Sequence, residues 1–349
     1  MKKEHILIIR FSALGDVAMA VPVVYSLAMT YPHVRITVLS RGFARPFFED
    51  LAPNVSFMEA DIKGEYRGIK GLNALYRRLV AKKPTAVADF HGVLRSTYLR
   101  MRFNMERFRV EHINKHRSGK RALTSSSDKR MVQQPTSFDN YAEVLARLGY
   151  PVKLQFSSIF GNEGGDLSLL PSAIGKRNEG EQWIGIAPFA AHKGKVYPPE
   201  MMERVIDLIE ENNPHCRIFL FGRGRDESHT FPEWCARHSH CIFVGDHLDT
   251  MRQELVLMSH LDVMVSMDSA NMHMASLTGT PVVSVWGATH PYAGFMGWHQ
   301  SEDNAVQLDL PCRPCSIFGN KPCRRGDFAC MNGIKPEQIY DKINRLLSH

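Results

Sequence analysis

The sequence of 349 residues has no long uncharged hydrophobic run. Residues 17–31 form the longest nearly uncharged stretch near the N-terminus, which is shorter than the roughly 20 residues of a membrane-spanning helix and contains Pro22. This absence excludes an integral membrane protein. A secretory leader is not expected either, because Glu4 and Arg10 bound the apolar residues 6–9 and no small-residue cleavage site follows. We therefore expect a cytoplasmic protein.

The sequence also lacks the composition of a disordered chain. Hydrophobic residues make up 44% and charged residues 23%, so enough apolar surface is available to offset the entropy of ordering. The charge is unevenly distributed. Residues 1–150 contain 25 Lys and Arg against 13 Asp and Glu, whereas residues 151–349 contain 18 against 23. The basic half is typical of a surface for nucleic acid, an anionic membrane or a phosphorylated substrate.

Short apolar runs alternate with helix-length segments along the chain, which predicts two parallel sheets with crossover helices, an α/β fold of two doubly wound units. The expected strands are residues 5–10, 35–39, 55–58, 86–90, 183–187, 217–221, 241–244, 262–266 and 282–285. A Gly-, Ser- and Pro-rich linker at 151–181 places the boundary near 165. We expect domains at 1–165 and 166–334, followed by an amphipathic helix at 335–347 within the C-terminal segment 335–349. Ligands of such folds bind beyond the carboxyl ends of the strands.

The first strand-to-helix turn ends in Gly15 and Asp16, just before an apolar helix. Asp16 has two interpretations. It is a plain helix cap, or it is a carboxylate placed to take a proton from a hydroxyl nucleophile. Because Gly-x-Gly-x-x-Gly is missing from this turn, it is not expected to bind a dinucleotide.

A second turn follows the apolar strand that ends near Ser266. Asp268 and Ser269 come next, Ala270 begins a helix, and His273 lies one turn along it. The free N–H groups and the positive dipole end of such a helix bind anions, so this turn predicts a phosphate site. The alternative to a phosphate site is that Asp268 only caps the helix and His273 packs in the core. Lys195, in the loop after an earlier strand, is a further candidate for phosphate binding, and a solvated loop explains a lysine there equally well.

Four segments together resemble glycosyltransferase family 9, the heptosyltransferases of lipopolysaccharide core synthesis. They are residues 10–16, 89–96, 195–198, and 268–273 with Gly279-Thr280-Pro281. The resemblance keeps the same order over nearly the whole chain. It implies a GT-B fold with two Rossmann-like domains facing a central cleft, the acceptor on the N-terminal domain and the nucleotide sugar on the C-terminal one. It also implies that the last helix crosses back to the N-terminal domain.

The resemblance further implies ADP-L-glycero-D-manno-heptose as the donor and an inner-core or lipid A-linked saccharide as the acceptor, with inversion at the anomeric carbon. Asp16 would be the general base. The donor phosphates would be bound by Lys195, Asp268, Ser269, Ala270 and His273. Ala190 and Ala191 stand where the family often has a small hydroxyl residue, and Ser-Ala replaces the commoner Thr-Gly or Ser-Gly at the helix start.

The basic first half suits a phosphorylated glycolipid acceptor at the cytoplasmic face of the inner membrane, with which the protein would associate peripherally. The candidate acceptor residues are Arg95, Lys115, Arg117 and Lys120. Asp-x-Asp, the carboxylate pair that anchors a divalent ion on many nucleotide sugars, occurs nowhere in the chain. We therefore expect metal-independent catalysis, with no cofactor required.

Four of the seven cysteines are clustered, at Cys312, Cys315, Cys323 and Cys330. The first pair has the spacing of zinc ligands, but the second pair is more widely spaced than usual. A structural zinc, reduced thiols and a disulfide all remain open.

Two other functions are compatible with parts of the sequence. A nucleotide-sugar epimerase can share the fold but needs no separate acceptor, so the basic first domain argues against it. A nucleic-acid-binding protein would explain the positive charge, but no base-stacking motif, helix-turn-helix or zinc-finger spacing is present. We therefore expect no nucleic-acid partner.

Overall fold

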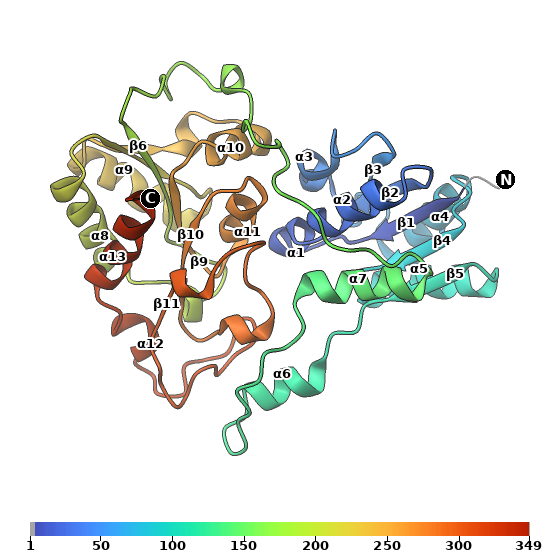
Figure 1. Cartoon of the computed structure of the whole chain (residues 1–349). Coiled ribbons are helices and arrows are strands. Elements are labelled where there is room, and N and C mark those ends of the chain that lie inside the picture. Colours follow the sequence, from blue (N-terminus) through green and yellow to red (C-terminus); the bar gives the residue numbers. More distant parts are fainter. Residues whose placement is uncertain (1–3, 349) are drawn as a thin grey trace. The chain divides into compact units, whose positions relative to one another are not determined.

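The computed structural model describes residues 4–348, which form two compact units (Figure 1). The first unit runs to Lys115 and also takes in Pro135–Ile159. The second takes in His116–Gln134 and the residues from Phe160 onward. Each unit has one parallel sheet with helices on both faces. This confirms the predicted α/β class with two Rossmann-like sheets.

The sheet of the first unit has the strand order β3-β2-β1-β4-β5, and all neighbouring strands are parallel. Its strands are β1 (His5–Ile9), β2 (Arg35–Ser40), β3 (Val55–Glu59), β4 (Ala86–Asp89) and β5 (Arg109–His112). Its helices are α1 (Leu14–Ala18), α2 (Val21–Thr30), α3 (Arg45–Phe48), α4 (Gly68–Val80), α5 (Leu94–Met105) and α7 (Ser137–Arg147). The central strands β1 and β4 are buried throughout, as expected for apolar strands covered on both faces.

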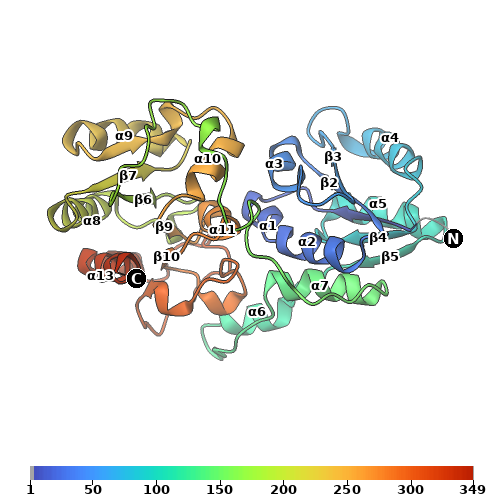
Figure 2. The ribbon, with the colours of Figure 1, turned by 45° about the horizontal axis from the view of Figure 1, so that its top comes forward.

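The helices of this unit divide between the two faces of the sheet. From the centre of the sheet, the connection from β1 to β2 runs toward one edge and the connection from β4 to β5 runs toward the other edge. Because both crossovers are right-handed, α2 and α5 lie on opposite faces of the sheet. Helix α7 packs against α2, and α4 packs beside α5 (Figure 2).

The sheet of the second unit has the order β11-β10-β9-β6-β7-β8 and is also parallel. Its strands are β6 (Gln182–Ala187), β7 (Cys216–Leu220), β8 (Cys241–Phe243), β9 (Val263–Met267), β10 (Val282–Trp286) and β11 (Ala305–Gln307). Its helices are α6 (Arg117–Leu123), α8 (Pro199–Asn212), α9 (Arg225–Arg237), α10 (Met251–Met258), α11 (Ala270–Leu277), α12 (Ala329–Asn332) and α13 (Pro336–Leu347). A short 3-10 helix, Lys193–Lys195, follows β6.

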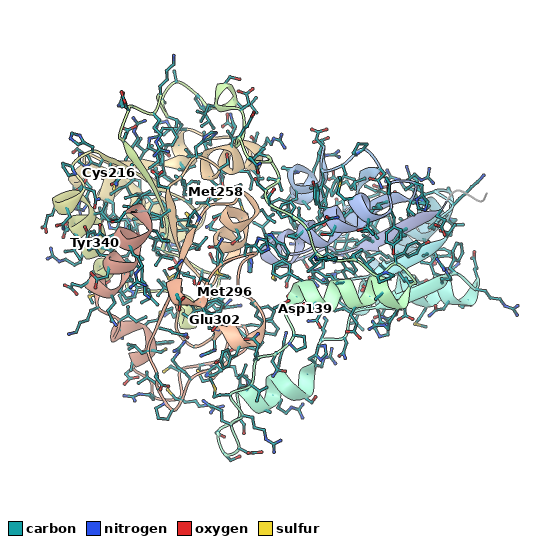
Figure 3. The ribbon with its side chains drawn as sticks, in the orientation of Figure 1. Asp139, Cys216, Met258, Met296, Glu302 and Tyr340 are labelled. Carbon is teal, nitrogen blue, oxygen red and sulfur yellow. The ribbon has the colours of Figure 1, made fainter. Side chains whose placement is uncertain are left out.

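The C-terminal helix α13 belongs to the second unit. It packs against α8, and Ile339 and Ile343 are buried in the core of this unit. Tyr340, labelled in Figure 3, donates a hydrogen bond to Asn213 Oδ1 at 3.4 Å. The expectation that this helix crosses to the N-terminal domain is therefore corrected, because its apolar face is covered by α8 and by strands β9 and β10.

Residues 116–134 were expected in the first domain, 1–165, but they pack on the second unit. Lys129 Nζ donates to the carbonyl oxygens of Pro311 and Arg313, both at 2.8 Å, and Gln134 N donates to Tyr292 O at 2.8 Å. The main boundary lies between residues 159 and 160. A stretch of sequence inside the expected first domain thus extends the second one.

Candidate functional site

The first candidate site lies where the strand order of the second sheet reverses. β6 and β9 are neighbours, but the chain goes from β6 toward β7 and from β9 toward β10. The connections that follow β6 and β9 therefore diverge, and such a switch point is where open α/β sheets bind ligands. The first connection carries Lys195 and the second carries Asp268 and Ser269.

Lys195 and Asp268 form a buried ion pair at this point. Lys195 Nζ lies 3.0 Å from Asp268 Oδ2 and also donates to the carbonyl oxygen of Asp268 at 3.0 Å. The side chains are 16% and 4% exposed. The structure thus joins two predicted site residues that are 73 positions apart.

The N-terminus of α11 begins directly after Asp268. Ser269 occupies the N-cap position in extended conformation, yet within the described chain its hydroxyl makes no capping hydrogen bond. It lies 3.2 Å from Ser266 Oγ instead. The first-turn N–H groups, beginning with Ala270, are therefore not capped by Ser269, which suits an anionic ligand. His273, one turn along α11, is 6% exposed.

Close backbone packing holds Lys195 in place. Gly319 has a φ of +73°, and a Cβ there would lie 2.6 Å from Lys195 Cγ. Gly194 and Gly287 also approach each other, since a Cβ on Gly287 would lie 2.7 Å from Gly194 O. Ala288 N donates to that same oxygen at 2.8 Å. Any side chain larger than hydrogen at Gly319 would therefore displace the lysine.

Arg313 fixes the loop after β10, a role that the sequence analysis missed. Its guanidinium is 5% exposed and donates to the carbonyl oxygens of Gly287 and Thr289 at 2.5 and 3.0 Å. His290 ends this loop, and burial together with the charge of Arg313 lowers its pKa to about 4. A histidine in the loop that follows an apolar strand is the signal that could have drawn attention to this loop.

The second candidate site lies at the corresponding switch point of the first sheet, where β1 and β4 are neighbours. Asp16 Oδ2 lies 2.6 Å from Arg10 Nη2 and accepts a hydrogen bond from Ala13 N at 3.1 Å. Tyr141 donates to the carbonyl oxygen of Asp16 at 3.1 Å. The Asp16 side chain is 34% exposed, whereas that of Arg10 is only 8% exposed. The carboxylate is thus held by a buried cation and still reaches the surface.

Asp89, the last residue of β4, and His91, from the loop that follows, complete this site and were not among the predicted site residues. Asp89 is fully buried and accepts hydrogen bonds from the backbone N–H groups of His91 and Gly92, both at 2.9 Å. Phe11 N donates to His91 Nδ1 at 3.4 Å. Burial and the positive charges of Arg10 and Lys115 lower the pKa of His91 to about 3, so the ring is neutral near pH 7.

The predicted acceptor residues fall into two groups. Lys115 lies against the loop after β4, because a Cβ on Gly92 would be 3.3 Å from Lys115 Cε. Arg95 is exposed in the first turn of α5, which follows the same loop. Arg117 and Lys120 instead lie on α6 of the second unit, where Lys120 Nζ is 4.3 Å from the centroid of the Phe295 ring. The structure therefore does not bring all four together in one unit.

The four clustered cysteines line one small pocket of the second unit, together with the cations Arg313, Lys321, Arg324 and Arg325. Burial raises the pKa of Cys330 to about 11. At Cys323 burial acts in the same direction, but backbone N–H groups at residues 325–328 outweigh it and lower the pKa. Among residues 4–348, no group of three or more His, Cys, Asp or Glu side chains is arranged to hold a metal ion. The structural zinc stays a prediction.

In the described part of the chain, no helix combines the length and apolarity needed to cross a bilayer.

The chain has clear relatives. Residues 72–322 match the family Glycosyltransferase family 9 (heptosyltransferase). Lipooligosaccharide heptosyltransferase 2 of Campylobacter jejuni strain 81116 is 29% identical over 85 residues, which are 24% of this chain and only 26% of that protein. Lipopolysaccharide core heptosyltransferase OpsX of Haemophilus influenzae is 22% identical over 291 residues, 82% of this chain and 80% of its own.

Solved structures share the fold. A family 9 glycosyl transferase from Veillonella parvula has a TM-score of 0.74 at 18% identity, covering 100% of this chain and 98% of its own. The E. coli heptosyltransferase WaaC with ADP has a TM-score of 0.67 at 15% identity, covering 98% and 99%. The iron-containing dodecameric glycosyltransferase TibC of E. coli H10407 has a TM-score of 0.55 at 14% identity, covering 99% and 76%. These matches confirm the GT-B architecture.

Proposed function

The chain belongs to glycosyltransferase family 9, and on that premise we propose that it transfers a heptose from ADP-L-glycero-D-manno-heptose to an inner-core or lipid A-linked saccharide of lipopolysaccharide. Its relatives include a lipooligosaccharide heptosyltransferase and a lipopolysaccharide core heptosyltransferase, which supports the heptose and the core acceptor. The observation that carries the proposal is the buried Lys195–Asp268 pair at the uncapped start of α11. This is an anion site at the switch point of a doubly wound sheet.

The donor diphosphate is bound in this proposal by the second unit. Lys195 Nζ donates to the carbonyl oxygen of Asp268 and lies 3.0 Å from its carboxylate Oδ2, so Asp268 positions this cation beside the first-turn N–H groups of α11. Ser269 and Ala270 supply backbone donors, and His273 approaches from one turn along the helix. Fixed donors of this kind stabilise the negative charge that develops on ADP as it leaves, without reorganising during the reaction.

Asp16 is the proposed general base. It takes the proton from the acceptor hydroxyl as that oxygen attacks the anomeric carbon and the bond to ADP breaks, which inverts the configuration there. Arg10 and the Ala13 N–H fix the orientation of the carboxylate. Neutral His91, with its Nε2 3.5 Å from Ser12 Oγ, supports the same turn.

Metal independence is part of the proposal. The cation of Lys195 and the helix dipole supply the positive charge that a divalent ion would otherwise bring to the diphosphate. The proposed acceptor is a phosphorylated glycolipid at the cytoplasmic face of the inner membrane. The candidate acceptor residues are Arg95 and Lys115 in the first unit, and Arg117 and Lys120 on α6 of the second unit.

The proposal is tested by mass analysis of the core oligosaccharide from cells that lack the gene. We expect the core to be truncated at a heptose, and the wild-type gene to restore it. An Asp16→Asn gene expressed to the same level should fail to restore it. A core of unchanged mass in the deletion strain would reject the proposed substrate.

A further inference from the structure

Helix α5 exposes a row of large apolar side chains. Leu94 is 90% exposed, Met101 57% and Met105 77%. Spacings of seven and four residues place all three on one face of the helix. The opposite face packs on the sheet through the fully buried Leu99 and Phe103. The exposed row therefore lies on the side of α5 that does not need to be apolar for the protein to fold.

Helix α4 extends this face. Asn73 Oδ1 accepts a hydrogen bond from Tyr98 at 2.8 Å and another from Arg102, and these contacts hold α4 beside the exposed side of α5. Ile69 lies one turn before Asn73 on the same side of α4 and is 67% exposed. We call Ile69, Leu94, Met101 and Met105 the docking face. Several large exposed apolar residues on one side of a unit are typical of an interaction surface.

The charge around the docking face has one sign. α4 and α5 contain six Lys and Arg residues and no Asp or Glu. Lys70 and Arg95, each adjacent in sequence to a member of the docking face, are exposed. The first unit as a whole, residues 1–115 and 135–159, contains 21 Lys and Arg against 12 Asp and Glu. An apolar row with a basic rim matches an anionic lipid surface, where side chains enter the acyl boundary and cations meet the headgroups.

We propose that the docking face of α4 and α5 inserts into the surface of an anionic membrane. α5 begins directly after the loop that carries His91, so the membrane would lie next to the acceptor side of the first unit. This position rests on the proposed function, because only a lipid-linked acceptor requires it. The binding itself depends on the apolar face and the charge alone.

Sedimentation of the full chain with vesicles tests the proposal. Vesicles of phosphatidylcholine alone are compared with vesicles that also contain phosphatidylglycerol, at low and high salt, without substrate. We expect binding to the anionic vesicles that weakens with salt. The Leu94→Ser/Met105→Ser variant should partition about tenfold less or lower still, because two exposed apolar side chains no longer enter the bilayer. Thermal melting checks that this variant is folded.

Met29→Ser is the matched control. Met29 is 50% exposed on α2, which lies on the opposite face of the same sheet, so its loss should leave partitioning unchanged. Equal partitioning of the double variant and wild type would overturn the proposal, as would a loss of the same size in the control. A wild-type chain that self-associates without vesicles, and no longer does so after Leu94→Ser/Met105→Ser, would show that the face binds a second copy instead.

Transfer to a soluble acceptor fragment separates this proposal from the proposed function. Wild type and the Leu94→Ser/Met105→Ser variant should act equally on that fragment, since both side chains are largely exposed and neither is a candidate site residue. Inactivity of both proteins toward it would count against the proposed function and leave the vesicle result standing.

Discussion

Lys195→Ala should affect two properties that depend on the Lys195–Asp268 ion pair: the affinity for ADP and the stability of the fold. Lys195 Nζ lies 3.0 Å from Asp268 Oδ2, and under the proposed function this cation binds the donor diphosphate beside the start of α11. A charge-assisted hydrogen bond contributes about 1.5 to 3 kcal/mol, so the dissociation constant for ADP should rise roughly 10- to 100-fold. AMP should lose less affinity, because a monophosphate spans less of the site. Isothermal titration calorimetry at one fixed ionic strength measures the dissociation constants of ADP and AMP.

The same substitution should also destabilise the protein. Asp268 is 4% exposed, so removing its partner leaves a buried carboxylate without its cation, at a cost of about 3 to 5 kcal/mol. Lys195→Ala/Asp268→Asn removes that charge and should recover much of the stability in denaturant titration. It should not recover the affinity for ADP, because the cation is still missing.

Lys193→Ala is the matched control, since Lys193 begins the same 3-10 helix and is exposed. Its effect on ADP affinity should be small. The reasoning fails if the double variant regains ADP affinity together with stability, because Lys195 would then serve only to neutralise Asp268. It fails equally if Lys193→Ala weakens ADP as much as Lys195→Ala does.

Three further outcomes are expected. His91 has a pKa of about 3 in the folded chain against an ordinary 6.5, so the unfolded chain takes up the proton first as the pH falls. This difference in pKa should lower the free energy of unfolding by about 2 kcal/mol at pH 5. Denaturant titrations should therefore show that His91→Gln loses less stability in acid than wild type does. Gly319→Ala should weaken ADP binding in calorimetry, because its Cβ would meet Lys195 Cγ at 2.6 Å and φ is +73°. Heptose transfer should persist in excess EDTA; activity that disappears and returns with Mg²⁺ or Mn²⁺, while the fold is retained, would reject metal independence.

The central strands were predictable because each is a continuous apolar run, as expected of a strand that is buried on both faces. All nine expected strands lie within one residue of observed ones. β5 was missed because Arg109–His112 is half exposed and half charged, and β11 because it has only three residues. Two helices carry a weak sequence signal: Pro232 lies inside α9, and the exposed apolar row of α5 weakens its amphipathic pattern.

The candidate sites were partly predictable from the turns that follow apolar strands. Lys195 and Asp268 were both identified, but their ion pair was not, since sequence does not specify which loops meet. Arg10 and Asp89 end or follow buried strands as isolated charges, which is the signal that could have identified them. The placement of Arg117 and Lys120 on the second unit depends on long-range contacts of residues 116–134, and no local pattern records those contacts.

The central claim is tested most directly by reconstituting the reaction. The purified chain is incubated with ADP-L-glycero-D-manno-heptose and a heptose-free lipid A-linked acceptor, and the product is analysed by mass spectrometry and by nuclear magnetic resonance of the new linkage. We predict one added heptose with inverted anomeric configuration. Asp16→Asn should lower turnover about 100-fold or more with ADP affinity nearly unchanged. A product of retained configuration, or near-wild-type turnover by Asp16→Asn, would contradict the account.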